Sequence, residues 1–290
     1  MRLGPFDPNN IRVRRGGGGG MGLPIGGGGI GCGTIVIALI AYFVFGADPM
    51  QFLGGGQGTS DQSGYSQQQG GQPGESAEQI CHDNQYATEA CNALSSLNQT
   101  WQPVFQQAGV QWHQPELVFY QGGTSSGCGA AQSSMGPFYC PQDEGIYIDT
   151  SFYDEMARQL GAKGDFARYY VIAHEYGHHV QKLTGVADQI ASAQQQDPRN
   201  ANRYQVMMEL QADCYAGVWA GKNRNLIEPG DFEEGMTAAS AIGDDTLEKN
   251  AGQSVNPETF THGTSAQRME ALRTGMQSAS DTACDKYVHA

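Results

Sequence analysis

One five-residue pattern constrains this chain more than any other part of its sequence: His174-Glu-Tyr-Gly-His178. It lies within residues 166–183, where apolar spacing and the following Gly185 predict a helix with Asp165 as its N-cap. Residues four apart share one helix face, so both imidazoles point the same way, with Glu175 beside them. Two histidines and a carboxylate at this spacing can hold a zinc ion and supply a general base. The alternative interpretation is an exposed polar helix face.

A second helix, predicted over residues 202–222, offers the remaining ligand for such a site. Glu209 and Asp213 share one of its faces, and a catalytic zinc needs a third protein ligand together with one open position. We expect Glu209 to be that ligand and Asp213 to accept a hydrogen bond from the ring N–H of a ligand histidine. A solvated helix face is the alternative. The apolar neighbours of both carboxylates oppose it, because unpaired carboxylates are costly to bury.

Residues 76–290 are expected to form the folded domain. Further helices are predicted at 76–106, with a break or helix end at Trp101-Gln-Pro103, and at 152–160, 231–242 and 264–279. Strands are predicted at 117–120, 138–140 and 145–149, the last two joined as a hairpin by the turn 141–144, while residues 122–136 are expected to form a loop. The predicted fold class is α+β, a mainly helical zincin-like domain with a small antiparallel sheet. In zincin-type folds the strand before the active-site helix is an edge, so this likeness implies that strand 145–149 is an edge that pairs with extended substrate.

The first 75 residues differ in composition from the rest. Residues 1–29 are rich in arginine and glycine, residues 30–46 carry no charge and are mostly apolar, and residues 47–75 are rich in Gly, Gln and Ser. We expect a single transmembrane helix at 30–46, because this uncharged run is just long enough to span a bilayer. The arginines that precede it place residues 1–29 in the cytoplasm. Residues 47–75 are expected to be a flexible linker that carries the catalytic domain in the periplasm or outside the cell. A cleaved signal peptide and a buried core helix are the alternatives.

Charge and cysteine content narrow the choice of partner and compartment. The net charge of -14 argues against nucleic acid, because phosphate binding needs a basic face. Of seven cysteines, Cys32 lies in the apolar run, and the other six contain no CxxC pair. Disulfides formed in an oxidising compartment are therefore expected, with six reduced thiols as the alternative. Nearness in sequence favours Cys81–Cys91 and Cys128–Cys140, and elimination leaves Cys214–Cys284.

Several blocks of the sequence resemble the bacterial "putative neutral zinc metallopeptidase" family over nearly the whole chain. These blocks are Ala173–Gln181, Glu209–Gly217, Cys128–Ala131, Met135–Cys140, Ala241–Asp245 and His262–Arg268. A looser likeness is to the gluzincin membrane peptidases related to HtpX, which follow HExxH and ExxxD with a Thr-His-Pro element and an arginine. Thr261-His262 and Arg268 match that element, but Gly263 replaces the proline. The likeness implies that His262 steadies the oxyanion and Arg268 orients the site. The alternatives are a residue at a helix N-terminus and a surface arginine.

Together these features predict a zinc-dependent endopeptidase that acts on a protein or peptide substrate. His174, His178 and Glu209 would bind Zn²⁺, and Glu175 would take a proton from the metal-activated water. Two other functions remain open at this point. The chain could be a membrane-tethered binding or assembly module with a structural zinc, or a zinc hydrolase that acts on a non-peptide bond.

Overall fold

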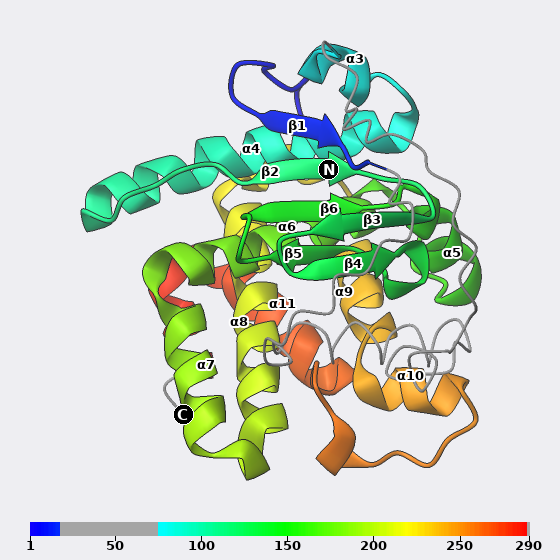
Figure 1. Cartoon of the computed structure of the whole chain (residues 1–290), viewed down its shortest axis with the longest axis vertical. Helices are drawn as coiled ribbons and strands as arrows, with labels where there is room; N and C mark the ends of the chain where they lie inside the picture. The colour runs from blue at the N-terminus through cyan, green and yellow to red at the C-terminus, as the bar shows by residue number, and fades with distance from the viewer. Residues whose placement is uncertain (18–74, 289–290) are drawn as a thin grey trace, which may run out of the picture.

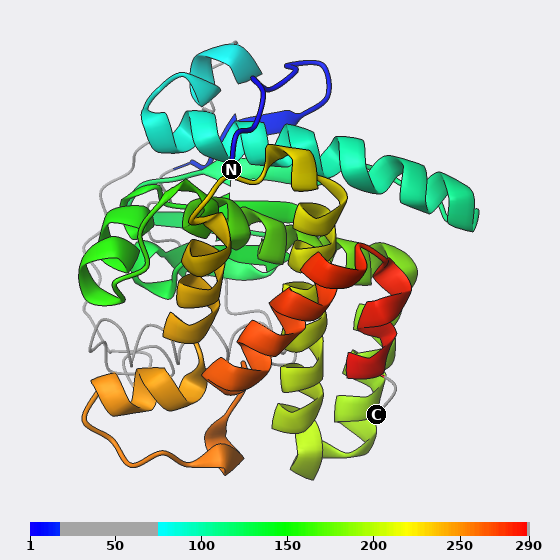
Figure 2. The same cartoon turned by 180° about the vertical axis from the view of Figure 1, so that it is seen from behind.

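The computed structural model describes residues 1–17 and 75–288 of the chain. A four-stranded sheet lies between a layer of helices on one face and a two-stranded hairpin on the other (Figure 1, Figure 2). Alternation along the strands produces these layers: Leu117 and Phe119 pack into the core with the helices, whereas Val118 and Tyr120 pack beneath the hairpin.

The four-stranded sheet was predicted to be antiparallel, but it is mixed. Its order is β1 (Arg12–Arg15), β2 (Glu116–Phe119), β6 (Gly145–Ile148) and β5 (Phe138–Cys140). Strands β1, β2 and β6 run parallel, and only the predicted hairpin of β5 and β6 is antiparallel. The prediction that residues 145–149 form a sheet edge is therefore wrong. Strand β6 is hydrogen-bonded on both sides, and the edges of the sheet are β1 and β5.

The region 122–136, expected to be a loop, contains a second small sheet. Strands β3 (Gly123–Ser126) and β4 (Gly129–Gln132) pair antiparallel, and a short 3-10 helix, Ser133–Met135, follows. The glycine-, serine- and alanine-rich sequence hid these strands, because it lacks the branched and aromatic residues that mark most strands. A disulfide between Cys128 and Cys140 ties this hairpin to the edge strand β5.

The first 16 residues belong to the folded domain. Strand β1 is hydrogen-bonded to β2, Met1 is 1% exposed, and Arg15 Nε lies 2.8 Å from Glu75 Oε2, where the described chain resumes. The predicted transmembrane segment 30–46 and the linker lie outside the described residues. A single crossing between residues 16 and 75 would put β1 and β2 on opposite sides of a membrane, which their pairing rules out. The predicted single-pass arrangement, with a cytoplasmic N-terminus and an exported catalytic domain, is therefore wrong. Within the described parts of the chain, no helix is both long and apolar enough to cross a bilayer.

The region 76–106 contains two helices, α3 (Ala77–Cys81) and α4 (Gln85–Ala108). The predicted break at residues 101–103 does not occur: α4 runs through Pro103 and ends at Gly109 in the left-handed conformation. Its buried face, which includes Trp101 and Phe105, holds the helix together by tertiary packing across the proline.

The helical layer is built around the helix that carries the His174–His178 pattern. This helix, α6, spans Asp165–Thr184 and ends at Gly185 as predicted, but its N-cap is Gly164 with a φ of 101° rather than Asp165. The other predicted helices are confirmed. They are α5 (Ser151–Gln159), α8 (Ala201–Lys222), α9 (Asp231–Ala241) and α11 (Ser265–Ser278). Two more helices, α7 (Val186–Gln196) and α10 (Asp244–Asn250), were not predicted.

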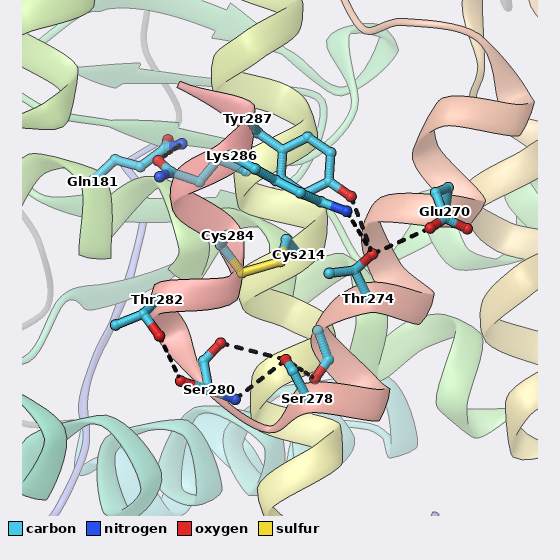
Figure 3. The surroundings of a disulfide bond; sticks show 12 residues. Gln181, Cys214, Glu270, Thr274, Ser278, Ser280, Thr282, Cys284, Lys286 and Tyr287 are labelled. Atoms are coloured by element: carbon cyan, nitrogen blue, oxygen red, sulfur yellow. Dashed lines mark hydrogen bonds between the residues drawn. A yellow bond between two sulfur atoms is a disulfide. The ribbon is translucent and has the colours of Figure 1, made fainter. Parts of the chain in front are cut away.

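Helices α8 and α11 cross at very short range, which brings α11 up to the predicted metal ligands on α6 and α8. A Cβ atom added at Gly275 would lie 1.9 Å from the carbonyl oxygen of Cys214, so only glycine fits there. Figure 3 shows the disulfide that joins Cys214 of α8 to Cys284 in the last 3-10 helix, Asp281–Tyr287. The remaining predicted pair, Cys81–Cys91, also forms a disulfide, so all three expected pairings are confirmed.

Candidate metal centre

Helices α6 and α8 bring the three predicted metal ligands together. Nε2 of His174 lies 3.1 Å from Oε2 of Glu209, and Nε2 of His178 lies 3.6 Å from Oε1 of the same carboxylate. One ligand atom from each residue lies within 4.8 Å of the others. The helical spacing puts both imidazoles on the face of α6 that meets α8, as the sequence predicts.

The distances and the chemistry of this group suit zinc. Two ligand atoms at about 2.0–2.1 Å from a tetrahedral zinc ion are roughly 3.3 Å apart. The separations of 3.1 Å and 3.6 Å lie on either side of that value. Two imidazoles and one carboxylate form a donor set found in catalytic zinc sites, where a fourth position stays open.

Each of the three candidate ligands is also held by another polar side chain. Asp213 Oδ1 lies 2.8 Å from His174 Nδ1, as predicted. Gln181 Oε1 lies 2.8 Å from His178 Nδ1, and Gln205 Nε2 donates to Glu209 Oε1 at 3.0 Å. Neither glutamine was predicted from the sequence. Their spacing of three or four residues from the ligand on the same helix is the signal that could have found them.

Two further side chains hold Asp213. Arg268 of α11 donates from Nε to Oδ2 at 2.8 Å and from Nη2 to Oδ1 at 2.9 Å, and the hydroxyl of Tyr170 donates to Oδ1 at 2.5 Å. Arg268 is only 2% exposed, so the alternative of a surface arginine is wrong. Its guanidinium compensates the buried charge of Asp213 and fixes the carboxylate that faces His174.

The electrostatics of the site make protons compete with a metal ion for the same histidine nitrogens. Burial lowers the pKa of His174, but Asp213 and Glu209 outweigh it and raise that pKa to about 10. Burial raises the pKa of Glu209, but His178 and His174 overcome this and hold it well below its usual range. A metal ligand histidine must be neutral at the coordinating nitrogen, so metal binding here would release protons.

Glu175 lies beside the ligand histidines on α6 and is 8% exposed. Burial raises its pKa above the usual range, against the opposing effect of the two ligand histidines. A general base works best when its pKa is closer to the working pH, so this shift suits proton transfer.

His262 lies in the turn before α11 and is held by a carboxylate that was not predicted from the sequence. Its Nδ1 is 2.9 Å from Oδ1 of Asp244, whose Oδ2 accepts the backbone N–H groups of residues 261–263. His262 Nε2 is buried and has no hydrogen-bond partner among the described residues. Gly263 has a φ of 89°, which proline cannot adopt, and this explains the departure from Thr-His-Pro. An added Cβ there would touch Leu210, so the turn packs on α8 next to Glu209.

A second group of carboxylates, Asp165, Asp231 and Glu234, is close enough to hold a cation. The amino group of Met1 lies 3.0 Å from Asp165 Oδ1 and 2.6 Å from Asp231 Oδ1. Asp165 and Asp231 therefore pair with that amino group, while Glu234 accepts the backbone N–H of Phe166 at 3.0 Å. The group contains no nitrogen ligand of the kind that zinc prefers.

Comparison with known proteins agrees with the site. The model of the family described as "Putative neutral zinc metallopeptidase" matches residues 5–287. The chain is 49% identical over 197 residues to the uncharacterized protein YpfJ of Escherichia coli, covering 67% of this chain and 69% of that protein. It is 38% identical over 206 residues to the uncharacterized protein Rv2575 of Mycobacterium tuberculosis, covering 67% of this chain and 68% of the relative. No solved structure matches it. Because the family model spans almost the entire sequence, the chain belongs to the "putative neutral zinc metallopeptidase" family.

Proposed function

We propose that this protein is a zinc-dependent endopeptidase in which His174, His178 and Glu209 hold the metal and Glu175 is the general base. One observation carries the proposal: three ligand atoms of the type zinc prefers converge within 4.8 Å beside a buried carboxylate of raised pKa. When bound, zinc would act as a Lewis acid toward the attacking water and the scissile carbonyl.

Glu175 would accept a proton from the attacking water and then deliver it to the leaving amine. The His262–Asp244 pair would act on the charge that develops on the carbonyl oxygen. Asp244 accepts from Nδ1, so a protonated His262 would present its free Nε2–H as a donor. Buried donors directed at developing charge are a strong source of transition-state stabilisation.

Strand β5 is the candidate surface for the substrate backbone. It is one of the two edges of the sheet, and an extended peptide could add to it as a further strand. The hydroxyl of Tyr139 on β5 lies 3.0 Å from His179 Nδ1, next to the ligand His178 on α6. This contact would keep a peptide on β5 in a constant position relative to the metal.

A structural zinc site fits these residues less well than a catalytic one. Structural zinc sites fill all four positions with protein ligands. Among the described residues, only His174, His178 and Glu209 come together here as candidate ligands. A structural zinc would also leave Glu175 without a role. Hydrolysis of a non-peptide bond is separated from peptidase activity by product analysis.

The test is zinc content and cleavage of an unstructured protein such as casein by the full chain. Glu209→Ala should lose zinc and activity. Glu175→Gln should keep zinc and lose at least about 100-fold in activity, the usual contribution of a general base. Glu233→Gln, an exposed carboxylate on α9, is the matched control and should change neither. A zinc-loaded Glu175→Gln variant with full activity would sink the mechanism.

A further inference from the structure

Two buried glutamines connect His178 to the neighbouring helix. Gln181 and Gln211 are both 0% exposed. Gln181 Oε1 lies 2.8 Å from His178 Nδ1, and its Nε2 lies 2.8 Å from the carbonyl oxygen of Met208 and 3.0 Å from Gln211 Oε1. One side chain of α6 therefore contacts a metal ligand at one end and two groups of α8 at the other.

The partners of the Gln181 amide permit only one orientation. Met208 offers a carbonyl oxygen, which only accepts, so it requires the NH₂ group of Gln181. The amide oxygen must then face His178, where it accepts a hydrogen bond from Nδ1–H. The reverse orientation would place two oxygens together at Met208 and lose that hydrogen bond.

This orientation decides the tautomer of His178. With its proton on Nδ1, a neutral imidazole has a free lone pair on Nε2, the nitrogen that faces Glu209. Gln211 adds an acceptor for the Gln181 NH₂ group, while its own Nε2 has no partner among the described side chains and backbone. The contribution of Gln211 here is therefore its oxygen, which reinforces the same orientation.

We propose that Gln181, supported by Gln211, is a positioning residue that keeps Nε2 of His178 free and directed at the metal. The proposal rests on the metal site of the proposed function. The role of Gln181 is separate from that of Asp213, whose carboxylate accepts the hydrogen bond from Nδ1 of His174. Because Met208 directly precedes Glu209, Gln181 also sets the distance between α6 and α8 where the ligands of the two helices meet.

The test compares zinc dissociation constants of full-length variants by chelator competition. Gln181→Met keeps the size of the side chain but removes the acceptor, and should weaken zinc binding about 10–100-fold, as for other outer partners of metal ligands. Gln181→Glu keeps an oxygen facing Nδ1–H, and if protonated it can also donate to Met208, so it should bind zinc more tightly than Gln181→Met. Gln189→Met, at an exposed position on α7, is the control and should match the wild type.

A space-filling role for Gln181 gives the opposite order, because a buried methionine is then tolerated and a buried glutamate is not. Zinc affinity of Gln181→Met within twofold of wild type, or tighter than that of Gln181→Glu, would overturn the proposal. Thermal unfolding of the metal-free proteins verifies that each variant folds. The measurement does not depend on peptidase activity: a wild type that binds zinc but cleaves no protein refutes the proposed function, while the order of the two variants still decides the role of Gln181.

Discussion

Arg268 and Asp213 form a two-point ion pair in the interior of the protein, 55 residues apart in sequence. Asp213 is 0% exposed and Arg268 2% exposed, so both charges are removed from water. Asp213 also contacts His174, so the pair connects α11 to a candidate metal ligand on α6 through α8.

Removing one member of this pair should be far more harmful than removing both charges. Arg268→Met leaves a buried carboxylate without its counter-ion and should lower the free energy of unfolding by about 3–5 kcal/mol. Adding Asp213→Asn removes the uncompensated charge and should restore part of that loss. Urea unfolding of the metal-free proteins measures both effects. Strictly additive losses in the double variant would contradict the coupling.

The His262–Asp244 pair should affect the rate of the reaction rather than metal binding. His262→Gln should retain zinc and lower kcat about 100-fold or more, the effect of losing one oxyanion donor. Asp244→Asn should lower kcat less, because His262 stays in place but loses its carboxylate partner. Zinc content and steady-state kinetics on one peptide report both. A His262→Gln variant with unchanged kcat would remove His262 from the reaction.

The close crossing of α8 and α11 should tolerate no added methyl group. Gly275→Ala would bring a Cβ to 1.9 Å from the Cys214 carbonyl oxygen and 2.6 Å from the Val218 nitrogen. We expect a loss of at least about 1–3 kcal/mol in the free energy of unfolding, the usual cost of overpacking. The control is Gly4→Ala, where a Cβ meets nothing within 4 Å. Equal stability of the two variants would show that the helices separate without cost.

Asp149 should contribute to stability in a pH-dependent way. Burial raises its pKa, but hydrogen bonds from Ser133, Gly122 N–H and Ser151 N–H outweigh this and hold the pKa below its usual value. A carboxyl whose pKa is lower in the folded state stabilises the protein above its unfolded pKa of about 3.9. That stabilisation is lost as the pH falls through the folded-state pKa.

Asp149→Asn should therefore lower the free energy of unfolding at neutral pH. It should also make that free energy fall less steeply as the pH is lowered into the acid range. The measurement is the free energy of unfolding in urea at a series of pH values from neutral to acid. Exposed Asp188 on α7 provides the control, Asp188→Asn, which should leave the curve unchanged. An Asp149→Asn protein whose acid limb keeps the wild-type slope would show that this carboxylate does not govern it.

The sequence by itself determined the two helices of the candidate metal centre and the residues that meet there. Helical periodicity is local, so His174, His178, Glu209 and Asp213 could be assigned to faces from spacing alone. The hairpin of residues 138–148 was equally local, because its strands are joined by a short turn.

Only the tertiary structure decided the contacts between residues far apart in the chain. Strand β1 pairs with β2 a hundred residues later, which overturned both the antiparallel sheet and the single-pass membrane arrangement. Asp244 contacts His262 because the turn before α11 lies against the start of α10. Gln181 contacts α8 because α6 and α8 pack together. Such contacts depend on which surfaces bury one another, and local propensity carries no information about that choice.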